Sequence, residues 1–116
     1  MKKLILFAII SLFLLMPMAA MAQNAVISSG MTTSDRLIAS GNCYIYGVEI
    51  ISGASTAVVS IYDALTISGT TVLQGQAAMA NLWNGARLNN PVEVFTGIYA
   101  DVTGTGAAYT VYYKCR

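Results

Sequence analysis

Two patterns of hydrophobic residues divide the chain. Residues 4–15 form a run that is apolar except for Ser11, follows two lysines and is soon ended by Pro17. A positive start, an apolar run of about a dozen residues and a small-x-small site, here residues 20–22, are the three parts of a secretory signal peptide. A membrane anchor needs roughly 18 or more uninterrupted apolar residues. We therefore predict a cleaved signal peptide over residues 1–22, no transmembrane segment after its removal, and a mature protein that is secreted or periplasmic.

Beyond the signal peptide, hydrophobic residues recur with the period of two that is typical of β-strands. Short stretches rich in β-branched and aromatic residues alternate with glycine-containing turns, at intervals of roughly 8 to 12 residues. The pattern predicts strands over residues 43–51, 56–62, 70–73, 92–95, 98–103 and 107–115. This spacing indicates an all-β protein, a small antiparallel β-sandwich with a jelly-roll-like architecture.

Alternation also predicts which side chains share a face of a strand. The expected sets are Tyr44, Tyr46, Val48 and Ile50 in the first strand, Ala57, Val59 and Ile61 in the second, and Ile98, Ala100 and Val102 in the fifth. Adjacent residues must point to opposite sides. Tyr112 and Tyr113 therefore cannot both face the core, and one of these phenols is expected at the surface.

Two segments have no clear strand pattern. Residues 74–90 are punctuated by asparagine and glycine and are followed by Pro91, so we interpret them as a loop that carries a short turn and the single tryptophan, Trp83. Met79, Leu82 and Trp83 in this loop either fold back to plug one end of the sandwich or stay exposed as a contact patch. Residues 23–34 are small and polar, and form either a flexible N-terminal arm or an edge strand. Residues 35–116 are then one β-sandwich domain.

The charge balance excludes one class of partner. Without residues 1–22, four lysines and arginines face five aspartates and glutamates, a net charge of −1. Such a surface lacks the basic footprint that nucleic acid requires. So few charges also give little electrostatic protection against self-association, so a homo-oligomer is one expected state.

The chain has two cysteines, Cys43 and Cys115. A secreted or periplasmic protein is in an oxidising compartment, where an even number of cysteines usually forms disulfide bridges. Cys43 opens a predicted strand and Cys115 ends another, so antiparallel pairing of these strands would bring the two thiols together. We expect an intramolecular disulfide, which in the chain-entropy model stabilises the fold by roughly 4 kcal/mol. An intermolecular bridge or free thiols are the alternatives.

The inventory of catalytic groups is small. The chain contains no histidine, which removes the Ser-His-Asp and Cys-His arrangements and the usual zinc ligand. Asp63 and Asp101 lie near strand ends and could in principle act as a glycosidase pair, but single carboxylates in such places more often cap turns. Calcium-loop spacing is missing as well. We predict a protein that is not an enzyme and has no catalytic residues, cofactor or metal site.

Aromatic residues are the better functional lead. Seven tyrosines and one tryptophan are many for so short a chain. Aromatic rings with a polar tip are enriched at binding faces and subunit interfaces, although tyrosine is also simply a good strand residue. The candidate binding residues are Trp83, Tyr112, Tyr62 and Tyr99.

One family resemblance can be stated. Its motifs are residues 32–36 (TTSDR), 44–47 (YIYG), 59–63 (VSIYD), 90–92 (NPV) and 97–106 (GIYADVTGTG). Together they resemble small uncharacterised β-sandwich proteins of tailed bacteriophages and prophages. The resemblance spans residues 31–113, which is most of the mature chain, and implies a virion-associated or accessory structural protein. The signal peptide and the cysteine pair depart from that pattern.

These observations favour a secreted, non-catalytic structural or interaction module, with self-assembly or a phage-related role as possible modes of action. Its partners would be proteins, including further copies of itself, or a cell-surface glycan. A first alternative is a carbohydrate- or surface-binding module that uses exposed aromatic rings. A second alternative is an inhibitor of an exported enzyme, which would present the loop of residues 74–90.

Overall fold

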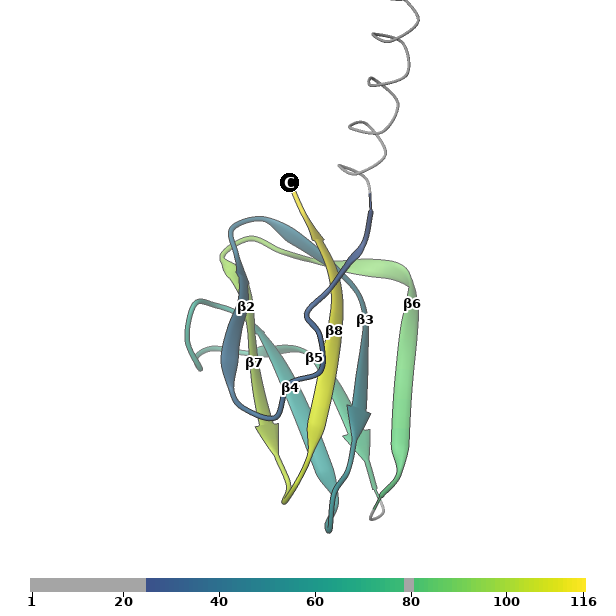
Figure 1. The fold of residues 1–116 in the computed structure, drawn as a ribbon. Coiled ribbons are helices and arrows are strands. Elements are labelled where there is room, and N and C mark those ends of the chain that lie inside the picture. Colours follow the sequence, from purple (N-terminus) through teal and green to yellow (C-terminus); the bar gives the residue numbers. More distant parts are fainter. Residues whose placement is uncertain (1–24, 79–80) are drawn as a thin grey trace, which may run out of the picture.

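The computed structural model describes residues 25–78 and 81–116. The expected signal peptide, residues 1–22, lies outside the described residues, as does Met79. All named elements in the described ranges are strands (Figure 1). They are β1 (Ile27–Ser28), β2 (Arg36–Ser40), β3 (Cys43–Ile51), β4 (Ala57–Asp63), β5 (Thr71–Ala77), β6 (Trp83–Val94), β7 (Gly97–Thr103) and β8 (Ala108–Cys115).

The eight strands form two four-stranded sheets that pack face to face (Figure 1). Sheet A has the order β1-β8-β3-β6 and sheet B the order β2-β7-β4-β5, and neighbouring strands in both are antiparallel. Among connections between these strands, only that from β4 to β5 stays within a sheet, while the others cross the sandwich. This is the architecture of an eight-stranded jelly roll, so the predicted fold class is confirmed.

The core lies between the sheets and is built by the alternation predicted from the sequence. In β4, Ala57, Val59 and Ile61 are fully buried, as expected for the inner face of a strand. In β7, Ile98 and Ala100 are fully buried, whereas Tyr99 and Asp101 are half-buried. The other fully buried apolar residues come from β3, β5, β6 and β8; they include Cys43, Ile45, Ala77, Val94 and Val111.

In β3 the predicted alternation is wrong, because a β-bulge reverses it halfway along the strand. Ile45 lies opposite Tyr113 and Gly47 lies opposite Tyr112, so Tyr46 is an extra residue. A bulge of this kind shifts the phase of every following side chain. Before it the inward residues are Cys43 and Ile45, and after it they are Val48 and Ile50. Tyr44 and Tyr46 therefore do not share a face with Val48 and Ile50.

The predicted loop over residues 74–90 is also wrong. Residues 74–77 complete β5 and residues 83–90 belong to β6, each at the open edge of its sheet. The polar and turn-forming residues that suggested a loop have another explanation. Ile45 pairs with Val92 and Gly47 with Arg87, so residues 88–91 of β6 stand opposite one residue of β3. That irregularity accommodates the Asn-Asn-Pro sequence, and β6 bends there (Figure 1).

The segment before residue 35 contributes an edge strand. Ile27 and Ser28 form β1 against β8, and Thr32 forms a further antiparallel bridge with Tyr109. Backbone hydrogen bonds of 2.9 and 2.8 Å join Thr32 and Tyr109 in both directions. The described part of this segment is therefore an edge strand, which is one of the two alternatives expected from the sequence.

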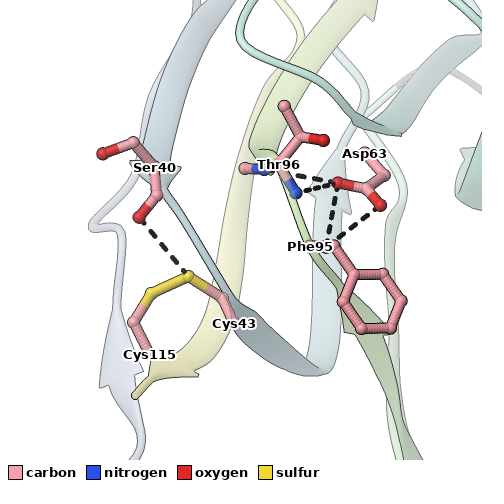
Figure 2. Close-up of a disulfide and its surroundings, with 7 residues drawn as sticks. Ser40, Cys43, Asp63, Phe95, Thr96 and Cys115 are labelled. Carbon is pink, nitrogen blue, oxygen red and sulfur yellow. Dashed lines mark hydrogen bonds between the residues drawn. A yellow bond between two sulfur atoms is a disulfide. The ribbon is translucent and has the colours of Figure 1, made fainter.

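One end of the sandwich is held by the disulfide and by an aspartate (Figure 2). Cys43 and Cys115 are register partners in β3 and β8 and are joined by the predicted intramolecular bridge, with their Cα atoms 3.9 Å apart. Asp63, at the end of β4, accepts hydrogen bonds from the backbone N–H groups of Phe95, Thr96 and Gly97 at 2.7 to 3.3 Å. This carboxylate therefore fixes the connection between β6 and β7.

Candidate binding face on the outer side of sheet A

The four candidate binding residues divide into two pairs on opposite sides of the molecule. Trp83 lies opposite Ile51 in sheet A, next to the position of the buried Ile50, and so points away from the core. Tyr112 is adjacent to the buried Val111 and also faces outward. The remaining two, Tyr62 and Tyr99, are on the outer side of sheet B. The expectation that Tyr112 and Tyr113 face opposite sides is met, because Tyr113 packs against the core.

Trp83 is a surface residue and does not plug the end of the sandwich. Its side chain is 56% exposed, and Leu82 beside it is exposed too, so the plug interpretation is wrong for these two residues. The indole is positioned by a glycine. A Cβ atom on Gly85 would lie 2.8 Å from Trp83 Cζ2 and 2.8 Å from the Glu49 side chain. The missing side chain of Gly85 therefore lets the indole and the Glu49 stem lie close together on the sheet.

Glu49, Tyr112 and Arg87 form a connected polar group next to the indole. The Tyr112 hydroxyl donates a hydrogen bond of 2.8 Å to Glu49 Oε2. The Arg87 guanidinium lies over the Tyr112 ring, 4.7 Å from its centroid, in a cation–π contact. The hydrogen bond to Glu49, and secondly burial, raise the pKa of Tyr112 above its ordinary value. The phenol therefore stays protonated and remains a hydrogen-bond donor.

A second glycine makes this arrangement possible. Tyr112 in β8 and Arg87 in β6 both lie opposite Gly47 in β3, one on each side of it. A Cβ atom at Gly47 would approach the carbonyl oxygen of Ala86 to 2.7 Å, so another residue would not fit without moving β6. With no side chain at this position, the guanidinium reaches across β3 to the aromatic ring.

A small pocket lies beside the indole. It has a volume of about 40 Å³, enough for a water molecule or a small substituent of a ligand. Its polar lining comes from Glu49 and Thr110, and the rest is largely apolar. The lining residues are Met31, Glu49, Ile51, Trp83, Ala108, Tyr109 and Thr110. Exposed apolar surface, a shallow pocket and a few fixed polar groups therefore occur together on this face.

A further polar cluster lies on the same sheet, near the disulfide. The Tyr44 hydroxyl donates a 3.0 Å hydrogen bond to Glu93 Oε1, and the Arg116 guanidinium is 3.8 Å from the same oxygen. Arg116 also donates to the Tyr44 hydroxyl and lies 5.1 Å from the centroid of its ring. The hydrogen bond to Glu93 and burial raise the pKa of Tyr44, while Arg116 lowers it. Tyr44 and Glu93 are direct register partners, so this cluster follows from strand pairing.

Sheet B has a simpler outer surface. Tyr62 and Tyr99 are direct register partners in β4 and β7, and Leu37 in β2 lies opposite Tyr99. These three side chains form a row across three strands. Both tyrosines are half-buried, whereas Trp83 is mostly exposed.

The two carboxylates considered for catalysis have other surroundings. Asp63 binds three backbone N–H groups (Figure 2). Although burial raises its pKa, these hydrogen bonds outweigh that effect and lower the pKa overall. Burial, followed by the negative charge of Asp35, raises the pKa of Asp101. Asp35 itself accepts a 2.8 Å hydrogen bond from the Val102 N–H. Neighbouring residues of the fold thus explain the direction of the pKa shift of each carboxylate.

Sequence reasoning missed several residues of the face around Trp83. Glu49 had a recognisable signal, because it is the single charged residue in an otherwise apolar strand. Arg87 and Met31 had none, since both lie in segments without a strand pattern. Within residues 25–78 and 81–116, no cluster of three potential metal ligands is found. The same ranges contain no helix that is long and apolar enough to cross a membrane.

Comparisons with known proteins do not assign the chain to a family. No family model matches it, and no curated protein or solved structure matches it significantly.

Proposed function

We propose that this protein is a non-catalytic binding module that holds neutral sugar units of a surface polysaccharide on the outer face of sheet A. The observation that supports this most is the exposed indole of Trp83, fixed on the sheet by Gly85 and Glu49 beside a pocket with polar lining. Exposed rings held in one orientation by their neighbours are favourable binding platforms, because little conformational entropy is lost on binding.

The chemistry of the face fits a sugar. The apolar C–H side of a pyranose ring can stack on the indole, and its hydroxyl groups can bond to fixed polar side chains. Glu49 offers carboxylate oxygens as acceptors, and Thr110 offers a hydroxyl beside the pocket. The pocket of about 40 Å³ is too small for a ring but suits one ring substituent.

Charge favours a neutral ligand. Glu49 would repel an acidic sugar, and Arg87 already lies over Tyr112. Residues 23–116 have a net charge near zero, which gives no long-range attraction to an anionic polymer. Neutral hexose or N-acetylhexosamine units are therefore the expected class of ligand.

The structure is compatible with a location outside the cytoplasm. The Cys43–Cys115 disulfide is of the kind that persists in oxidising compartments. Secretion itself still depends on the predicted signal peptide. The inhibitor alternative loses the feature that motivated it, because the segment expected to be an inhibitory loop consists largely of β5 and β6.

A glycan array followed by calorimetry tests the proposal. The exported protein should retain neutral glycans, and Trp83→Ala should weaken binding of the best of them by at least about tenfold, or 1.4 kcal/mol. Phe95→Ala is the matched control. Phe95 is another exposed aromatic residue, 66% accessible, at the opposite end of the sandwich, and its removal should leave affinity unchanged.

Gly85→Ala sharpens the same test. The added methyl group would displace the indole without removing it, so affinity should fall while the tryptophan remains. Equal losses from Trp83→Ala and Phe95→Ala would contradict the proposed face. Loss caused by Tyr62→Ala instead would move the site to sheet B. Failure to retain any glycan would overturn the sugar-binding proposal.

A further inference from the structure

The sandwich has an open cleft along the side formed by β5 and β6. The cleft has a volume of about 110 Å³, of the same order as the roughly 150 Å³ apolar cavity that can hold a benzene molecule. Its floor includes Val48 and Ile50 of the core. The full lining is Val48, Ile50, Leu73, Gln74, Gly75, Gln76, Asn84, Gly85 and Ala86.

The cleft is open because the inward positions of both edge strands carry small or polar residues. Gly75 lies opposite Val59 and Ala86 lies opposite Val48, so both occupy core-facing positions without filling them. Asn84, opposite Ile50, bridges the edges by donating a 2.6 Å hydrogen bond to the Gln76 carbonyl. Core volume on this side is therefore left unfilled by the chain's own strands.

Next to the cleft, these edges also lack the usual protection against pairing with another chain. Within the described residues, β5 pairs only with β4 and β6 only with β3. Residues 71–77 and 83–86 contain no charged residue and no proline. Natural edge strands are normally blunted by such residues, and an exposed edge without them is a template for strand addition.

The opposite edge of sheet A offers a suitable strand. Residues 25–31 carry no charge. Ile27 is 52% exposed, although it lies opposite Tyr113, whose side chain packs against the core. Directly opposite residues share a face, so Ile27 is an inner-face residue that the described residues of its own domain do not cover fully. β1 uses one edge to pair with β8, and its other edge is open among the described strands.

We propose that β1 of a second copy pairs with β6 and places its Ile27 in the cleft. Strand directions alternate through β1, β8, β3 and β6, so β1 and β6 run in opposite directions. A second copy in the same orientation would therefore add β1 antiparallel to β6 and continue sheet A from one molecule to the next. In this arrangement β1 keeps its pairing with β8 of its own molecule, so the two copies do not exchange a strand.

The register can be stated as well. Ile27 is level with Ile45, because both lie opposite Tyr113, and Ala86 is level with Val48. Because Tyr46 is the extra residue of the bulge, the offset is counted along β8, where Ile27 is level with Tyr113 and Val48 with Val111. Placing Ile27 over Ala86 thus requires an offset of two residues, roughly 7 Å along the strands. Such a contact is heterologous: it uses two different surfaces of the molecule, so it repeats and builds an open filament and not a closed dimer. This inference does not rest on the proposed sugar-binding function, although Gly85 belongs to both the cleft and the sugar site.

Two variants test the interface from its two sides. Ile27→Lys alters the donated strand and Ala86→Lys alters the receiving cleft; both residues are exposed, so both variants should fold. Leu37→Lys, an exposed residue of β2 in sheet B, is the matched control. Analytical ultracentrifugation over a concentration series, with electron microscopy, should show filaments for the wild type and the control. Each interface variant alone should be monomeric, with a thermal midpoint close to that of the wild type.

An equimolar mixture of the two interface variants decides the question. Ile27→Lys keeps an intact cleft and Ala86→Lys keeps an intact β1, so the mixture should form 1:1 dimers and nothing larger. The two altered surfaces both carry lysine and cannot rescue each other by charge pairing. A wild type that stays monomeric, a mixture that stays monomeric, or a mixture that forms filaments would each overturn the proposal. Loss of assembly in Leu37→Lys would also overturn it.

Discussion

Phe95 and Trp83 lie at opposite ends of the sandwich, and both are largely exposed. At the Phe95 end, the surrounding groups hold the backbone together. The disulfide joins β3 to β8, and Asp63 binds the N–H groups of the turn that carries Phe95 (Figure 2). At the Trp83 end, the neighbours hold the side chain: Gly85 makes room for the indole, and Glu49 lies beside it. Exposure alone therefore does not identify a binding residue; what distinguishes Trp83 is a fixed ring next to polar groups and a pocket.

The largest expected effect concerns the disulfide end. Replacing both Cys43 and Cys115 by alanine removes a link across 72 positions of the sequence and should lower the free energy of unfolding by roughly 4 kcal/mol. Chemical denaturation of the oxidised wild type and the double variant measures the difference. Sugar affinity of the folded fraction at low temperature should not change. A large loss of affinity there would show that the two ends are not separable.

Asp63→Asn should have the next largest effect on stability, about 1 kcal/mol, because an amide is a weaker acceptor than a carboxylate for the three backbone donors. The effect depends on pH. The hydrogen bonds lower the pKa of Asp63 in the folded state although burial raises it, so its stabilising contribution is present above the unfolded pKa of 3.8. That contribution is lost as the pH falls through the lower folded pKa. Unfolding curves of the two proteins should therefore converge in acid, and a constant difference at all pH values would contradict this explanation.

Tyr109→Phe tests a buried group near the Trp83 end. The Tyr109 hydroxyl donates a 2.8 Å hydrogen bond to the Ser34 carbonyl, and its loss should cost about 1 kcal/mol. Burial is the main cause that raises the pKa of Tyr109 to about 12 from 10.0. The unfolded chain thus ionises first, so the wild type should lose stability as the pH rises from 10 towards 12. The phenylalanine variant should lose less over that range; an identical alkaline decline in both would count against the assignment.

Trp83→Ala and Phe95→Ala should have the smallest effects on stability. Both side chains are exposed, so each change should alter the free energy of unfolding by no more than about 0.5 kcal/mol. Thermal unfolding followed by circular dichroism measures this. A loss of several kcal/mol in Trp83→Ala would mean that the indole has a structural role, and the contrast between the two ends would disappear.

The parts of the fold that the sequence predicted correctly are those set by local alternation. The inner faces of β4 and β7 follow directly from strand periodicity. The Cys43–Cys115 bridge was expected for a different reason, from the even number of cysteines and their places at the ends of two strands. Alternation failed in β3, because a bulge at Tyr46 depends on two neighbouring strands and has no reliable local signal. It also failed for β6, whose open edge tolerates polar residues and whose bulged segment contains turn-forming ones.

The candidate site was less predictable than the fold. Trp83 and Tyr112 were identified from residue type alone, but their shared face depends on β6 and β8 both pairing with β3. Connections that cross between sheets put strands side by side that are distant in the sequence, and alternation carries no information about such pairs. The roles of Gly47 and Gly85 follow from this pairing as well. Gly47 leaves room for Arg87 to reach Tyr112, and Gly85 leaves room for the Trp83 indole beside Glu49.

The most direct test of the proposed function is the fluorescence of the single tryptophan during titration with sugars. Because Trp83 is the only tryptophan in the chain, any change in its emission reports on this site. Titration with soluble cello-, chito- and manno-oligosaccharides should shift the emission of the exposed indole to shorter wavelength for at least one of them, with saturation, and equally in Phe95→Ala. Emission that no member of the panel changes, or sugar binding measured by calorimetry with unchanged emission, would contradict the account.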